Sequence, residues 1–165
     1  MSCLHFFAKN QILANTTQNL KLHQDKQTSL LSDREQIIDV IETFFESGKT
    51  KDLTKLKEIQ LDDSSFSSFS DVPPYDLKDF ATTVMLEELK FVSISDYDYK
   101  ITNPKISIFG ETAVAAFELN QKGMLVDNKA FTGQHISING RATFVLVKKP
   151  TWKIVHIHLS KIKDY

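Results

Sequence analysis

The sequence has few of the features that mark extracellular or membrane proteins. Its single cysteine, Cys3, cannot form a disulfide within the chain, so nothing indicates an oxidising compartment. No apolar run approaches the roughly 18 residues that a membrane span requires. Residues 1–11 make a poor signal peptide, because their apolar run is short and no basic residues precede it. We therefore expect a cytoplasmic protein that does not bind a membrane.

The chain also has no excess of charge and no motif that holds a cofactor. Twenty Lys and Arg residues stand against 21 Asp and Glu residues, which leaves a net charge of −1. Proteins that coat nucleic-acid phosphates need a basic surface, so we expect no nucleic-acid partner. No Gly-rich phosphate loop and no Cys/His cluster occur, and we expect no cofactor. Arginine is scarce, since only Arg34 and Arg141 occur.

The composition is that of one soluble globular domain. Of the 165 residues, 41% are hydrophobic and 25% are charged. Residues 1–31 are rich in Gln, Asn and Thr and follow no sustained period, which predicts a mobile N-terminal arm. An extra helix that begins near Gln11 is the alternative. The folded domain is expected over residues 32–162.

Three helices are predicted in the first half of this domain. Residues 32–35, Ser-Asp-Arg-Glu, form a capping box that begins the first helix, and Gly48 provides its stop. The apolar face of this helix comprises Ile37, Ile38, Val40, Ile41, Phe44 and Phe45. A second helix is predicted over residues 52–59, and a third from an Asp76 cap to about Lys90. The third helix would bury Leu77, Phe80, Ala81, Val84 and Leu89.

Strands follow the helices along the chain. Residues 61–71, which are rich in Ser and Asp, are expected to form a loop before the third helix. After Phe91 the apolar period falls from about four to two. Strands are predicted over residues 93–101, 105–108, 112–119, 130–147 and 152–160, with a turn at Asn103-Pro104. Asn139-Gly140 is either a hairpin turn or a bulge within one curved strand. Helices followed by an antiparallel sheet define an α+β fold.

Alternation along the last predicted strand separates two faces. Val155, Ile157 and Leu159 would lie on one face, and Trp152, Ile154, His156, His158 and Ser160 on the other. The strand over residues 112–119 is apolar on both faces, and such strands must be covered on both sides. The helices can cover one side, and a second copy of the chain is the simplest cover for the other. We therefore expect a homodimer through the sheet, or a higher oligomer.

The face that carries the two histidines has the mixture of apolar and polar side chains that is typical of a ligand pocket. The candidate ligand-binding residues are Tyr97, Tyr99, Arg141, Thr143, Trp152, His156, His158 and Ser160. The guanidinium of Arg141 suits either a carboxylate ligand or a structural ion pair, and the geometry at Asn139-Gly140 decides which face Arg141 occupies. We expect a small apolar ligand with a polar or acidic end.

Three roles are open to the histidine pair. His156 and His158 would lie on one face about 6.5–7 Å apart, which suits a metal if His135 or Glu118 supplied a third ligand. They could instead act as acid and base on a ligand, or form hydrogen bonds at the strand ends. No spacing rule brings a third ligand to the pair, so we expect no metal site.

Three segments resemble a known family. They are residues 109–115 (Phe-Gly-Glu-Thr-Ala-Val-Ala), 140–143 (Gly-Arg-Ala-Thr) and 152–160 (Trp-Lys-Ile-Val-His-Ile-His-Leu-Ser). Together with the preceding helices, they resemble the SnoaL-like branch of the nuclear transport factor 2-like superfamily over about residues 33–160. The His-x-His-x-Ser ending also resembles the association (hub) domain of calcium/calmodulin-dependent protein kinase.

The resemblance implies a cone-shaped α+β fold with three N-terminal helices packed on a strongly bent antiparallel sheet, and a cavity at the open end. It matches Arg141 to the Arg of a SnoaL-like Gly-Arg-x-Thr element. His156 and His158 match the two histidines of the hub domain's last strand. The pocket arginine of the hub domain falls at Thr143, which departs from that pattern.

Two functions are compatible with this superfamily, which hosts enzymes, binding modules and scaffolds. The first is a SnoaL-like domain with a small-molecule-binding cavity. If it is an enzyme, we expect a cofactor-free isomerisation, dehydration or hydrolysis, with His156 or His158 as acid or base. The alternative is a non-catalytic oligomerisation module of the hub type.

Static light scattering of the purified chain distinguishes these assemblies by counting subunits. The strand that is apolar on both faces predicts a dimer, whereas the resemblance to the hub domain predicts a ring of many subunits. A stable monomer would contradict the argument that a second copy covers the sheet.

Overall fold

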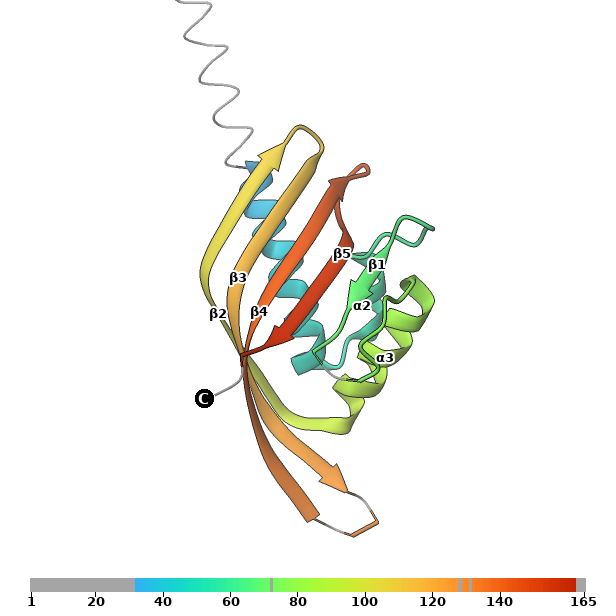
Figure 1. Cartoon of the computed structure of the whole chain (residues 1–165), viewed down its shortest axis with the longest axis vertical. Helices are drawn as coiled ribbons and strands as arrows, with labels where there is room; N and C mark the ends of the chain where they lie inside the picture. The colour runs from blue at the N-terminus through green and yellow to red at the C-terminus, as the bar shows by residue number, and fades with distance from the viewer. Residues whose placement is uncertain (1–31, 72, 128, 131, 163–165) are drawn as a thin grey trace, which may run out of the picture. The chain divides into compact units, whose positions relative to one another are not determined.

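The computed structural model describes residues 32–71, 73–127, 129–130 and 132–162 (Figure 1). The chain divides into two compact units, residues 1–35 and 36–165, and the sheet belongs to the second. The predicted arm, with its alternative helix near Gln11, lies outside the described residues. No described helix is long and apolar enough to cross a membrane.

The first helix covers residues 32–50 and buries its predicted apolar face. It begins at Ser32, the residue predicted to cap it, and passes through Gly48, the residue predicted to stop it. A Cβ at Gly48 would lie 2.4 Å from the Cε1 atom of Phe91. Glycine is therefore needed for the close approach of this ring. The chain leaves the helix at Lys51, whose φ of 62° is left-handed.

The second predicted helix is confirmed as α2, Leu53–Glu58, which Asp52 caps by accepting from the Lys55 amide at 3.3 Å. The third, α3, covers Phe80–Ser93, and its N-cap is Asp79. The predicted start at Asp76 is wrong because the backbone of Lys78 pairs with that of Ser68 in both directions at 3.0 Å.

The predicted apolar face of α3 is also partly wrong. Leu77 lies outside the helix and is 58% exposed, and Leu89 is 60% exposed. The buried residues of α3 are Thr83, Val84 and Phe91. Their spacing shows which face of the helix points inward, and Glu87 lies on it three residues after Val84.

Five strands form one sheet in the order β1-β5-β4-β3-β2. Their bounds are β1 Ser67–Phe69, β2 Ile94–Phe109, β3 Thr112–Asp127, β4 Thr132–Lys148 and β5 Trp152–Lys161. β1 pairs with β5 in parallel, and the other neighbours are antiparallel. The α+β prediction is confirmed. β1 was expected to be loop, and it forms because its backbone joins the edge of β5.

β2 is one strand where two were predicted. The chain passes through Asn103-Pro104 without turning back, and its register against β3 shifts between Ser95 and Asp98 and between Thr102 and Lys105. Asp96 and Asn103 lie at these shifts with φ of 50° and 52°. These left-handed residues absorb the extra length as bulges, so the chain continues along the sheet.

The pairing of β4 decides between the hairpin turn and the bulge predicted at Asn139-Gly140. Its register against β3 is unbroken from the Thr112–Val147 pair to the Asp127–Thr132 pair, so these residues form neither a hairpin turn nor a bulge against β3. A Cβ at Gly140 would lie 2.6 Å from the carbonyl oxygen of Ser160. Glycine is therefore required there because β5 approaches closely.

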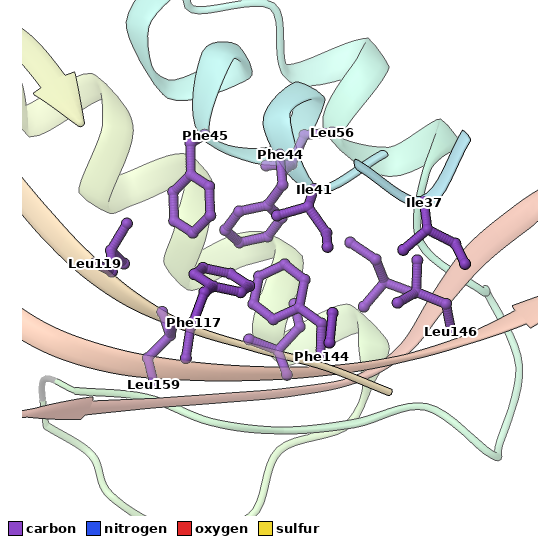
Figure 2. Packing of buried hydrophobic residues seen from close by; sticks show 14 of the residues in the cluster. Ile37, Ile41, Phe44, Phe45, Leu56, Phe117, Leu119, Phe144, Leu146 and Leu159 are labelled. Carbon is purple, nitrogen blue, oxygen red and sulfur yellow. The ribbon is translucent and has the colours of Figure 1, made fainter. Parts of the chain in front are cut away.

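The core lies between the first helix and one face of the sheet. Figure 2 shows Phe44 and Phe45 directed toward Phe117 and Phe144. The Phe44 ring lies 5.2 Å from that of Phe144, and the Phe45 ring lies 6.1 Å from that of Phe117, both edge to face. These contacts attach the first helix to β3 and β4.

Replacing Gly140 by Ala tests the close approach of β4 and β5. The new methyl group would meet backbone, which cannot rotate away, so we expect the free energy of unfolding to fall by about 1–3 kcal/mol in a urea titration. Gly133→Ala in the same strand is the matched control, because its methyl group meets only the flexible side chain of Met124. Equal effects of the two substitutions would contradict this explanation.

Candidate functional site

A bulge in β5 decides which of the predicted site residues share a face. Val145 pairs with His156, but the next residue of β4, Leu146, pairs with Ile154, so Val155 has no partner of its own. The extra residue reverses the alternation. The prediction that Trp152 and Ile154 share a face with the histidines is therefore wrong, since both are buried in the core.

The eight predicted ligand-binding residues consequently lie on two faces of the sheet. Trp152 and Tyr97 are buried in the core, and Tyr99 packs against it. The remaining five form what we call the outer face, opposite the core: Arg141, Thr143, His156, His158 and Ser160. On this face Arg141 pairs with Ser160 and Thr143 with His158. The structure does not bring the eight residues into one pocket.

The two outer-face histidines contact β1. The Nδ1 atom of His156 shares a hydrogen bond of 2.8 Å with the Ser67 hydroxyl. The Phe69 ring lies 6.3 Å from the His156 ring and 5.8 Å from the His158 ring. Burial, and then the nearby His158, lower the pKa of His156. Within the described residues, no three His, Cys, Asp or Glu side chains are grouped so that they could hold a metal ion.

A cavity of about 400 Å³ lies on the other side of the sheet, which is the core side. It is bounded by α3, by parts of residues 68–78 and by the sheet, and we call it the α3 cavity. Its apolar lining includes Phe44, Leu86, Leu89, Phe91, Ile94, Leu125, Ile136, Ile138, Ile157 and Leu159. Its polar lining includes Ser68, Thr83, Glu87 and Lys90. This combination is typical of a small-molecule site.

Glu87 presents a carboxyl group in the wall of the α3 cavity. Its Oε2 atom accepts a hydrogen bond of 3.0 Å from Nε2 of Gln60, which is itself buried and also donates to the Leu56 carbonyl at 3.2 Å. Burial raises the pKa of Glu87 to about 8, and neither the Gln60 hydrogen bond nor the charge of Lys90 offsets it. At neutral pH the carboxyl is therefore mostly protonated and can donate a proton.

Lys90 lies one turn further along the same face of α3. Its Nζ atom donates to Oε1 of Gln121 at 3.2 Å and lies 3.8 Å from Oδ1 of Asp71. The Tyr97 hydroxyl donates to the same Gln121 oxygen at 2.9 Å, and burial raises the pKa of Tyr97, so it stays neutral. Gln121, Tyr97 and Asp71 are all buried. Lys90 is thus held at the cavity by a network from β2, β3 and the segment before α3.

Glu87 and Lys90 were not among the predicted site residues. The signal for Glu87 was present, because it follows Val84 by three residues and precedes Phe91 by four, at the spacing of one helix face. A charged residue at an inward-facing position of a helix indicates a functional or paired group. The predicted inward positions of Leu77 and Leu89 obscured this pattern.

The comparison of the sequence with known families fits this architecture. The family model of the SnoaL-like domain matches residues 37–164. The chain belongs to the SnoaL-like domain family. It is therefore a member of the nuclear transport factor 2-like (NTF2-like) superfamily, as the resemblance predicted. No curated protein sequence matches the chain.

Solved structures share the fold of this SnoaL-like domain at low sequence identity. A proposed dehydratase of the NTF2-like family from Streptomyces avermitilis is 18% identical and has a TM-score of 0.70, over 81% of this chain and 99% of that one. An NTF2-like superfamily protein from Salmonella enterica is 22% identical, with a TM-score of 0.68 over 82% and 94%. The association domain of CaMKII from C. elegans is 18% identical, with a TM-score of 0.60 over 80% and 98%.

The raised pKa of Glu87 predicts a dependence of stability on pH. Between about pH 4.5 and about pH 8 the folded chain holds a proton on Glu87 that the unfolded chain has lost. The free energy of unfolding should therefore fall as the pH rises through this window, by up to about 1.4 kcal/mol per pH unit from this group.

Urea titrations of the wild type and of Glu87→Gln across this pH range isolate the contribution of Glu87 to the pH dependence of stability. The variant should lack the decline that the wild type shows. Glu88→Gln is the control, because Glu88 pairs with Lys57 at 2.7 Å and does not line the cavity. Identical pH profiles for wild type and Glu87→Gln would show that Glu87 titrates normally.

Proposed function

We propose that this SnoaL-like domain binds a small apolar molecule in the α3 cavity and that Glu87 exchanges a proton with it. The observation that carries the proposal is the Glu87 carboxyl in the wall of a cavity that is otherwise largely apolar. A cavity of about 400 Å³ falls in the range of sites for small organic ligands. The same wall therefore offers both binding surface and a group for chemistry.

The environment of Glu87 suits a general acid or base. A proton is transferred most effectively when the pKa of the catalytic group lies near the working pH, and burial brings Glu87 to about 8. Gln60 donates to the Oε2 atom of the carboxyl, and in this proposal the Oε1 atom faces the ligand. Isomerisation, dehydration and hydrolysis can each proceed by proton transfer without a cofactor. A proposed dehydratase of the same fold is consistent with this class, although fold alone does not assign a reaction.

The two histidines predicted from the sequence as acid or base receive less support for that role than Glu87. His156 and His158 lie on the outer face and do not line the α3 cavity. Ser67 already shares a hydrogen bond with His156. In this proposal their substitution by Ala, with the fold intact, leaves ligand binding in the cavity unchanged.

The second candidate function is an association module without chemistry. The observation that favours it is the outer face, where Val114, Ala116 and Val145 lie beside the histidines in neighbouring strands and the first helix does not cover them. A kinase association domain has the same fold. In this proposal a second copy of the chain covers the outer face, and the two functions can coexist because they use opposite faces of the sheet.

Titration with the neutral fluorescent probe N-phenyl-1-naphthylamine tests the binding proposal. Wild type should bind it saturably with one site per chain, and Ile138→Trp should weaken binding about tenfold or more, because the indole fills the cavity. Val147→Trp is the matched control, since Val147 lies in the same strand but on the outer face. Absence of saturable binding to wild type would contradict the proposal.

A further inference from the structure

Two polar groups of α3 face the same ligand space. Glu87 and Lys90 are three residues apart in the helix, so their side chains lie on one face. Both line the α3 cavity, and the charge of Lys90 acts on the Glu87 carboxyl. Across the cavity from α3, the sheet contributes Ile136, Ile138, Ile157 and Leu159, none of which has a polar side-chain group. Apart from Ser68 of β1 and Lys161 at the end of β5, the strand residues that line the cavity are apolar, so its polar groups lie mainly on α3 and the segment before it.

The charged groups of the lining are not equally available to a ligand. Lys78 is buried, and its Nζ atom donates to the carbonyl oxygens of Pro74 and Asp76 at 2.5 and 2.8 Å. Lys161 is exposed at the end of β5. Among the described residues, Lys90 donates one hydrogen bond, to Gln121, and a lysine ammonium has three N–H groups.

Asp71 does not accept a hydrogen bond from the ammonium of Lys90. The distance of 3.8 Å from Lys90 Nζ to Asp71 Oδ1 exceeds that of a hydrogen bond, and this oxygen has no hydrogen-bond partner among the described residues. An ammonium with N–H groups to spare therefore borders the cavity beside the carboxyl of Glu87. The remaining charges of the lining, on Lys78 and Lys161, are also positive.

We propose, building on the function proposed above, that the ligand is an apolar carboxylic acid, whose carboxylate binds between the ammonium of Lys90 and the protonated carboxyl of Glu87. One carboxylate oxygen accepts from Lys90 and the other accepts from the O–H of Glu87. Hydrogen bonds to an ionised acceptor are about twice as strong as neutral ones. The apolar remainder of the ligand lies against the sheet. An alcohol of the same length lacks the charge, and an amine would be repelled by Lys90.

Binding of this kind depends on the proton of Glu87. The charged or titratable groups near that carboxyl are Lys90 on its own helix, Tyr97 of β2, and Asp71 beyond Lys90. Tyr97 stays neutral because burial raises its pKa. When Glu87 loses its proton, two carboxylates face each other and repel. Affinity for a carboxylate should therefore fall as the pH rises through about 8, while that for an alcohol should not change.

Three probes of equal chain length test the inference: octanoate, octanol and octylamine. Isothermal titration calorimetry of the wild-type chain at about pH 6.5 and about pH 9.5 compares them without any variant. Octanoate should bind about tenfold or more tightly than octanol at the lower pH and lose most of this advantage at the higher pH. Octylamine should bind most weakly.

Variants then assign the effect to the two residues. Lys90→Met should remove the preference for octanoate while leaving octanol binding unchanged. Glu87→Gln should keep octanoate binding but remove its pH dependence, because an amide donates a hydrogen bond at any pH. Lys57→Met and Glu88→Gln are the controls, since these residues pair with each other at 2.7 Å and do not line the cavity.

The outcomes separate this inference from the function on which it rests. If octanol binds as tightly as octanoate at both pH values, the inference of a carboxylate site is contradicted, while the proposal that the cavity binds apolar molecules is supported. If none of the three probes binds and N-phenyl-1-naphthylamine does not bind either, the proposed function itself fails. Should Lys90→Met fail to fold, the probe series on wild type still decides the question.

Discussion

The contact between Phe44 of the first helix and Phe144 of β4 is the interaction on which the rest of the structure depends. Their rings meet edge to face at 5.2 Å, and both residues are fully buried. Phe44 also contacts Phe91 of α3 at 6.3 Å and forms part of the cavity wall. One side chain therefore connects the first helix, the sheet and α3. The cavity borders this connection, because Phe44 and Phe91 both line it.

The sequence predicted the α+β class and the family because both depend on patterns that are local in the chain. The periods of four and two, and the His-x-His-x-Ser ending, are visible without any tertiary contact. The structure departs from the sequence prediction where pairing with a neighbouring strand interrupts the alternation of side chains between the two faces. The unpaired Val155 reverses the alternation of β5, and Asp96 does the same in β2. Whether a strand carries an extra residue depends on its partner's register, so no single segment reveals it.

The candidate site was harder to predict than the fold for the same reason. Trp152 and the histidines share one strand, and an unbroken alternation would have placed them together, but the bulge moves Trp152 into the core. The outer face keeps the histidines and Arg141, and the opposite side of the sheet holds the cavity. Glu87 became a candidate only once the orientation of α3 was known. A single sheet thus separates the proposed association face from the cavity of the proposed function.

Proton uptake on ligand binding is the most direct test of the central claim, that a protonated Glu87 and Lys90 together hold an apolar carboxylate. Calorimetry of octanoate binding near pH 8, in two buffers of different ionisation enthalpy, measures it. Glu87 is about half protonated there, and a bound carboxylate favours its neutral form, so binding should take up about half a proton per chain. Binding of octanoate with no proton uptake, or with proton release, would contradict this account of the cavity.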